Sequence, residues 1–177
     1  MLALALLAAL ASPVVGTSLD GHWARPCLAM GKGGRHGTIF RLTVAGDAIE
    51  LVGQTYAHAD CDMPTIETRL TARLDTISER DQRIAATVTI DDVTMKPEAP
   101  EVVATWNRNP EAKSCAAREW HLGETQSVAG GACVPGHRFP RQGAKLEVQA
   151  FHDDDSLRLP YPLPGGDGGP IVLTRAQ

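Results

Sequence analysis

The clearest pattern along the chain is an alternation of apolar and polar positions with a period of two. In residues 38–44, TIFRLTV, the side chains of Phe40 and Leu42 fall on one face of an extended segment, with polar residues between them. Residues 45–47, AGD, predict a tight turn, because glycine adopts positive φ at little cost. Residues 48–57 alternate again. The two runs therefore predict a β-hairpin.

Residues 65–78 alternate more regularly, with Ile66, Leu70 and Leu74 on one face and charged residues on the other. The apolar residues also recur at positions i, i+4, i+8 and i+11, which is the spacing of one helix face. Four threonines in the segment favour a strand, because β-branched side chains fit a pleated surface better than a helix. We therefore predict a strand, with a helix as the alternative.

A similar strand is predicted over residues 83–92, after a polar turn at 79–82. Shorter strands are predicted at 101–106, 117–122, 126–129, 145–152, 157–159 and 171–174. The connecting segments are rich in glycine, proline and charged residues, and no internal repeat is visible. Short strands with one apolar face indicate an all-β fold, an antiparallel up-and-down barrel of about eight to ten strands. The alternative is a β-sandwich.

The N-terminus begins with an uninterrupted apolar run over residues 2–11, LALALLAALA. The run is shorter than the about 20 residues of a transmembrane helix, and small residues follow it, which suits a signal peptide cleaved after Ala11 or Gly16. No Lys or Arg precedes the run. We predict a signal peptide at 1–16 and one domain at 17–177, secreted or periplasmic and not integral to a membrane. The alternative for the run is a buried N-terminal helix.

The chain has four cysteines, Cys27, Cys61, Cys115 and Cys133. An even number in an exported chain indicates disulfides, and three pairings are open. The sequential pairing is favoured, because each pair flanks neighbouring predicted strands. Zinc is the alternative, since His58 lies close to Cys61, but no Cys-x-x-Cys or His-x3-His pair is present, as structural zinc sites usually require.

The charge pattern bears on the partners of the protein. The 17 basic and 21 acidic residues give a formal net charge of −4 and are mixed along the chain without a basic block. Phosphate binding needs a clustered positive surface, so we expect no nucleic-acid partner.

The triplet Gly21-His22-Trp23 opens the first predicted strand of the mature chain, and Arg175 lies in the last one. This pair resembles the Gly-x-Trp motif of the lipocalins and the wider calycin group, together with their C-terminal arginine. The resemblance implies that Trp23 closes one end of the barrel and stacks against Arg175. A simpler interpretation of Trp23 is a core aromatic residue beside a disulfide.

No sequence motif indicates catalysis, because the chain has no Gly-x-Ser-x-Gly and residues 31–34, GKGG, lack the order of a phosphate-binding loop. Asp91 and Asp92 are adjacent, so on a strand they would face opposite sides. The cluster His152, Asp153 and Asp155 is a weak candidate for Ca²⁺, and a solvated turn is the simpler interpretation. We expect no cofactor.

The leading functional hypothesis is an exported, non-enzymatic, lipocalin-like protein that binds a small apolar ligand inside the barrel. The residues predicted to line the ligand are Phe40, Leu42, Leu51, Leu70, Leu74, Ile84 and Val88. The alternatives are an interaction module that binds an envelope or extracellular protein, such as an inhibitor or adhesion subunit, and an enzyme with its site in the barrel mouth.

Overall fold

The computed structural model of the protein describes residues 17–116, 118–133, 138–153, 155–159 and 170–176. The strands are β1 (Gly21–Met30), β2 (His36–Ala45), β3 (Ala48–Tyr56), β4 (Pro64–Arg80), β5 (Arg83–Pro97), β6 (Gln126–Ser127), β7 (Lys145–Asp153), β8 (Ser156–Leu159) and β9 (Ile171–Arg175). The helices are the 3₁₀ turn η1 (Lys32–Gly34), α1 (Pro100–Arg108) and α2 (Pro110–Cys115).

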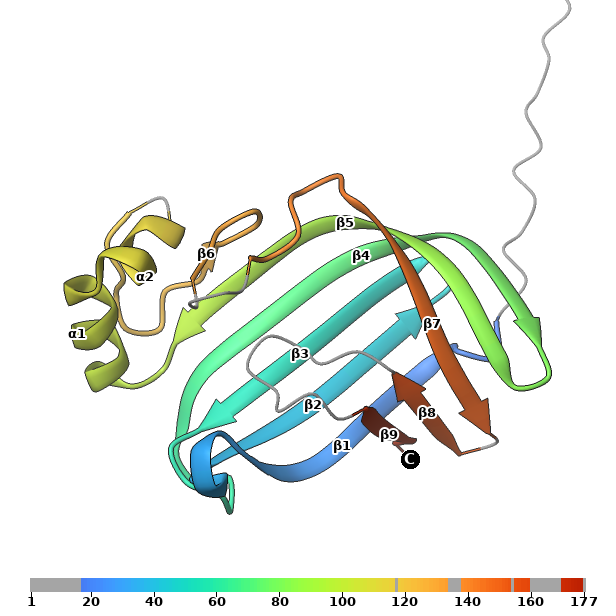
Figure 1. The fold of residues 1–177 in the computed structure, drawn as a ribbon, viewed down its shortest axis with the longest axis horizontal. Helices are drawn as coiled ribbons and strands as arrows, with labels where there is room; N and C mark the ends of the chain where they lie inside the picture. Colours follow the sequence, from blue (N-terminus) through green and yellow to red (C-terminus); the bar gives the residue numbers. More distant parts are fainter. Residues whose placement is uncertain (1–16, 117, 134–137, 154, 160–169, 177) are drawn as a thin grey trace, which may run out of the picture.

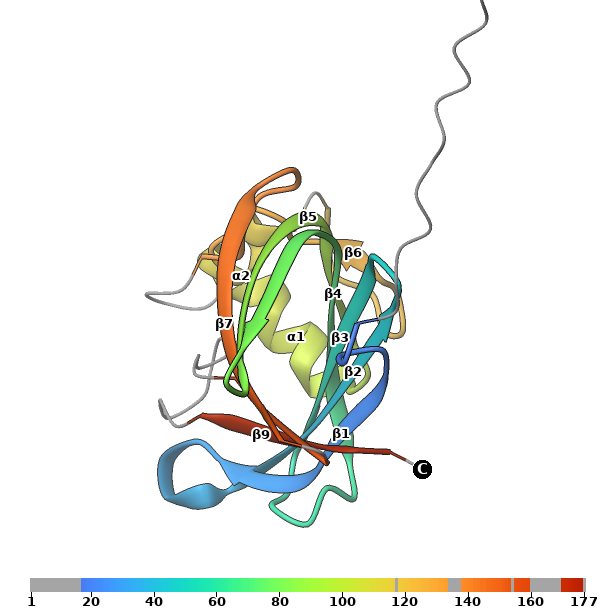
Figure 2. The same cartoon turned by 90° about the vertical axis from the view of Figure 1, so that its right-hand side faces the viewer.

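The strands form one antiparallel sheet that closes on itself. Its order is β4-β3-β2-β1-β9-β8-β7-β5-β6, and β4 also pairs with β5, which completes a ring of eight strands. Figure 2 views this ring from the end opposite the helices. The short β6 lies outside the ring, on the far end of β5, beside α1 and α2 (Figure 1). The predicted all-β up-and-down barrel is confirmed, and a single closed sheet is not a sandwich.

The β4–β5 hairpin curves over the barrel because it contains two bulges (Figure 1). In the pairing of the two strands, Asp75 and Asp91 have no direct partner. The Asp75 carboxylate accepts a hydrogen bond from Thr89 and lies 3.1 Å from the Lys145 ammonium, and these contacts, that of Thr89 first, lower the pKa of Asp75. Arg73 donates to Asp91. Each acid therefore stands at one of the two bulges and forms a hydrogen bond or ion pair with a neighbouring side chain there.

The apolar side chains gather in two clusters. The first lies inside the ring and joins residues of β1 and β2 to residues of β5, β7, β8 and β9, including Trp23, Leu42, Ile84, Leu157 and Leu173. The second joins β4 and β5 to the segment that carries the helices and to the loop after β6. Two half-buried residues, Ile49 and Leu74, pack against both clusters. The interior is therefore divided into two packed regions that meet at the wall formed by β3 and β4.

The strand predicted at 101–106 is wrong, because this segment is part of α1. The helix begins with Pro100 in its first turn, where the missing N–H costs nothing, and Glu101 follows in the same turn. Val103 and Trp106 pack against the second cluster, and their spacing of three residues places them on one helix face. The β-branched residues Val102 and Val103 favour a strand, but Pro100 favours the start of a helix, and the segment is helical.

The strand predicted at 117–122 is also wrong for residues 118–122, which form no regular structure. The backbone of Trp120 bonds to the side chain of Asn107 instead of a neighbouring strand, at 2.9 Å through both its N–H and its carbonyl. The fully buried indole donates to the Ala112 carbonyl. The strand predicted at 126–129 is shorter, since β6 comprises only Gln126–Ser127.

The predicted sequential disulfides are both present, as Cys27–Cys61 and Cys115–Cys133. The first bridge crosses β2 at Gly37, where a Cβ atom would lie 2.4 Å from the Cys61 sulfur. Only glycine leaves room for the bridge at this position. The second bridge ties the end of α2 to the loop after β6.

Among the described residues, no helix is both long and apolar enough to span a membrane. The predicted signal peptide at 1–16 lies outside the described part of the chain.

Candidate functional site

The register of the strands places a row of apolar side chains across the inner wall of the barrel. Trp23 lies opposite Leu42, Leu42 opposite Leu51, Leu51 opposite Leu70, and Leu70 opposite Val93. Directly paired residues of neighbouring strands point to the same side of a sheet. The row therefore extends across five strands, from β1 to β5, on the inward face.

All seven residues predicted to line a ligand lie on this inward face, but they differ in burial. Four of them, Phe40, Leu42, Ile84 and Val88, belong to the two packed clusters and are buried. Leu51, Leu70 and Leu74 are only half-buried. The residues of this group that keep some solvent exposure therefore lie on β3 and β4.

We define the β3–β4 strip as four of the half-buried inward residues of these strands, Ile49, Leu51, Leu70 and Leu74. The strip lies between the two clusters, and each of its members packs against at least one of them. Ala72, which pairs with Ile49, is buried and belongs to the second cluster. The strip is one part of the inner wall where the protein does not fully cover apolar side chains.

The outer face of the same wall carries ion pairs, beside the buried Val52. The Arg69 guanidinium lies 2.8 Å from Glu50 and 3.2 Å from Glu67, and the Lys96 ammonium bridges Glu67 and Glu98 at 3.4 and 2.7 Å. The hydrogen bond with Glu98 is the largest cause that raises the pKa of Lys96. The charged side chains stay on the solvent side of β3 and β4, and the leucines of the same strands face the barrel interior.

Trp23 and Arg175 lie together at the start of β1. The guanidinium carbon of Arg175 is 4.3 Å from the centre of the Trp23 ring system, and its two terminal nitrogens donate to the carbonyls of Asp20 and Ser18 at 2.9 and 3.0 Å. The indole N–H donates to the Leu19 carbonyl at 2.8 Å. The segment before β1 is therefore bound to the barrel by both side chains.

Gly21 allows this arrangement for two reasons. Its φ is +130°, a backbone conformation that side chains with a Cβ rarely adopt. A Cβ atom at this position would also lie 2.9 Å from a terminal nitrogen of Arg175. The glycine of the Gly-x-Trp triplet is therefore required where Arg175 passes over the backbone.

The structure does not bring His152, Asp153 and Asp155 together as metal ligands. The His152 ring meets Trp23 edge-on, with 5.6 Å between the ring centres, whereas Asp153 accepts a hydrogen bond from the Ser156 backbone. The hydrogen bonds with Ser156 lower the pKa of Asp153. His152 and Asp153 line a depression of about 260 Å³ at the β4–β5 turn, whose side chains are mainly polar. Asp153 thus acts as a turn residue.

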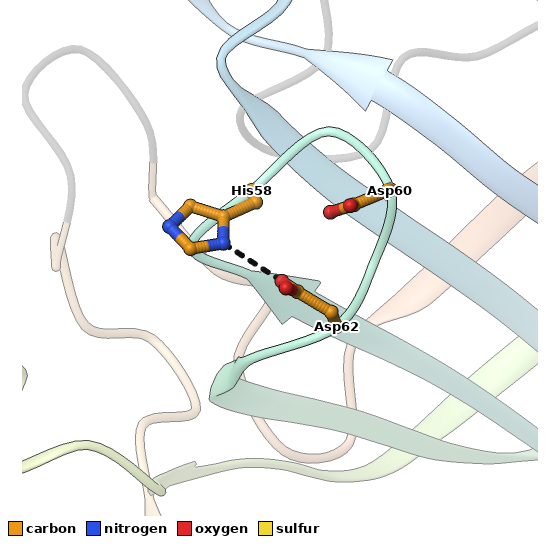
Figure 3. Close-up of side chains that lie close together, drawn as sticks. All are labelled: His58, Asp60 and Asp62. Atoms are coloured by element: carbon orange, nitrogen blue, oxygen red, sulfur yellow. Dashed lines mark hydrogen bonds and ion pairs between the residues drawn. The ribbon is translucent and has the colours of Figure 1, made fainter.

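Among the described residues, one group of His, Cys, Asp and Glu side chains is placed to hold a metal ion: His58, Asp60 and Asp62 (Figure 3). All three are exposed in the loop between β3 and β4. The zinc alternative predicted from the sequence paired His58 with the nearby cysteines and did not include the two aspartates as ligands. The sequence signal for this group is that His58, Asp60 and Asp62 stand at alternate positions. The spacing alone does not predict a site, because the conformation of the loop brings the side chains together.

The strand pairing defines the chain as a closed eight-stranded antiparallel β-barrel with one further strand outside the ring. Comparison with models of known protein families finds none that matches the sequence. Comparison with curated proteins also finds no match.

Proposed function

We propose that the protein is an exported, lipocalin-like binding protein that holds a small apolar ligand against the β3–β4 strip and performs no catalysis. The observation that carries the proposal is the half-burial of Leu51, Leu70 and Leu74, although they face the interior of a closed barrel. Leucine side chains that face inward are normally fully buried, since each gains about 1.5–3 kcal/mol from leaving water. A ligand on the strip would supply that burial.

The chemistry of the wall supports an apolar ligand. Sites for small molecules are concave and lined predominantly by hydrophobic side chains, with few polar groups to fix orientation. The strip offers aliphatic side chains only, and the ionic groups of β3 and β4 lie on the other face. The ligand is therefore expected to be uncharged over most of its surface and to bind through shape and desolvation.

Two further observations support the lipocalin-like and exported parts of the proposal. The Arg175 guanidinium over the Trp23 indole is the arrangement that the resemblance to the lipocalins implies. Two disulfides form and persist in oxidising compartments, which supports a secreted or periplasmic location.

A second candidate function is an interaction module that binds an envelope or extracellular protein. It is favoured by the packing at the Trp23 end of the barrel, where Leu42 of β2 belongs to the same cluster as Ile84 of β5 and Leu173 of β9. A filled interior leaves the outer loops as the binding surface. The two candidates differ in whether an apolar molecule enters the barrel.

Replacing Leu70 by glutamine tests the proposal, with Thr71→Gln as the matched control on the outer face of the same strand. We expect the affinity for N-phenyl-1-naphthylamine, an uncharged apolar fluorophore, to fall about tenfold in Leu70→Gln, because about 1.4 kcal/mol of apolar contact is lost. Thr71→Gln should leave it unchanged. Fluorescence titration measures both affinities. Equal binding by the two variants, or no binding by the unmodified protein, would contradict a site on the strip.

A further inference from the structure

The loop between β3 and β4 carries three potential metal ligands at alternate positions, His58, Asp60 and Asp62. One ligand atom from each side chain lies within 4.8 Å of the others, and the imidazole Nδ1 is 2.8 Å from the Asp62 carboxylate (Figure 3). All three side chains are exposed and face one another across the loop. One nitrogen donor and two oxygen donors therefore lie close together within the loop.

The backbone of this loop is fixed by contacts that do not depend on the three side chains. The Ala57 N–H donates to the Met63 carbonyl at 2.8 Å, which closes the base of the loop. Cys61, which lies between the two aspartates, is bonded to Cys27 of β1. The carbonyl of His58 packs on Gly37 of β2, where a Cβ atom would be only 2.6 Å away. The ligands therefore project from a rigid loop, and little conformational entropy is lost when they bind an ion.

The distances fit a small divalent ion. Zinc bonds to histidine nitrogen and carboxylate oxygen at about 2.0–2.2 Å, so ligand atoms around a tetrahedral ion lie about 3.3 Å apart. The separations of up to 4.8 Å have to shorten by at most about 1.5 Å, and the 2.8 Å between the His58 imidazole and the Asp62 carboxylate has to lengthen by about 0.5 Å. Rotation of the exposed Asp60 and Asp62 side chains provides a movement of this size without a change in the backbone.

We propose that His58, Asp60 and Asp62 form a zinc-binding site, with water at the remaining position. The two carboxylates balance the charge of the ion. Imidazole is a ligand that zinc accepts readily, whereas Ca²⁺ and Mg²⁺ prefer sets made only of oxygen. Neither β3 nor the inner wall takes part, so the site is independent of the proposed apolar ligand. Bound zinc would stabilise the folded protein, because an ion that binds only the folded loop shifts the unfolding equilibrium toward it.

Isothermal titration calorimetry with zinc chloride tests the site on the full exported chain, with both disulfides intact, no histidine tag and prior treatment with a chelator. We expect one equivalent of zinc to bind. His58→Gln and Asp62→Asn should each weaken the affinity at least tenfold, since the loss of a partner outside the ligand shell already costs about 10–100-fold. The control His121→Gln changes another exposed imidazole and should leave the affinity unchanged.

Thermal unfolding provides a second measurement that detects a folding defect. All four proteins should unfold at the same temperature without zinc, because the changed side chains are exposed. Zinc should raise the unfolding temperature of the unmodified protein and of His121→Gln, and leave that of His58→Gln unchanged. The proposal is overturned if zinc binds equally to His58→Gln, if His121→Gln alone loses binding, or if calcium binds as tightly as zinc.

Discussion

Replacement of Trp23 by alanine is expected to lower the free energy of unfolding by about 3–5 kcal/mol, the range for large aromatic side chains removed from a core. Trp23 is 1% exposed and belongs to the first apolar cluster. Its loss leaves a cavity in the first cluster and also removes the hydrogen bond to the Leu19 carbonyl. Urea denaturation followed by circular dichroism measures the change.

The contact between Trp23 and Arg175 is isolated by a double-mutant cycle. Arg175→Ala should cost less than Trp23→Ala, and the double variant less than the sum by about 0.5–1 kcal/mol, the value of an exposed cation–π pair. Arg158→Ala removes another exposed arginine of the neighbouring strand and should change stability by no more than about 0.5 kcal/mol. A coupling energy of zero would show that the two residues are not in contact, and the likeness to the lipocalins would lose its structural basis.

Removal of the first disulfide by the paired replacements Cys27→Ala and Cys61→Ala is expected to cost about 4 kcal/mol. The bridge closes a sequence separation of 34 residues, and the loss of loop entropy in the unfolded chain sets this magnitude. The paired replacements Cys115→Ala and Cys133→Ala, with a separation of 18, should cost about 3 kcal/mol. Chemical denaturation under non-reducing conditions measures both.

The two losses should add when all four cysteines are replaced, since the bridges connect different parts of the barrel. A loss below about 1 kcal/mol for the first pair would contradict the loop-entropy account. In that case the unfolded chain would already be held compact in this region by other contacts.

The sequence predicts the barrel because most of its strands are half-buried and show their alternation directly. Phe40 and Leu42 of β2 are buried, and their neighbours of opposite parity are less so. The 65–78 segment also fits a helix, and its β-branched threonines favour the strand that the structure contains. In both segments the residue types favour a strand, and the apolar side chains of that strand face the barrel interior.

The errors lie where a helix or a side chain, and not a neighbouring strand, satisfies the hydrogen bonds of the backbone. The 101–106 segment has the composition of a strand, but Pro100 starts a helix whose partly buried face packs on the second cluster. Trp120 resembles a strand residue in sequence, yet its backbone is bonded to Asn107. A bond between a side chain and a backbone 13 residues away leaves no periodic signal.

The candidate site was predictable only in part for a related reason. Alternation places Leu51, Leu70 and Leu74 on the inward face, and it does not distinguish them from Ile84 and Val88, which are buried. The difference in burial between these residues depends on which of them pack inside one of the two clusters, and the alternation of the sequence does not show this. The three ligands of the proposed zinc site depend in the same way on the loop conformation fixed by the disulfide.

The central claim is that the barrel holds a small apolar molecule, and native mass spectrometry of the protein purified without detergent tests it most directly. We expect a species heavier than the oxidised chain by the mass of one small molecule, either as isolated or after incubation with a long-chain fatty alcohol. The added mass should be lost in Leu70→Gln and retained in Thr71→Gln. A spectrum that shows only the bare chain under both conditions would contradict the claim.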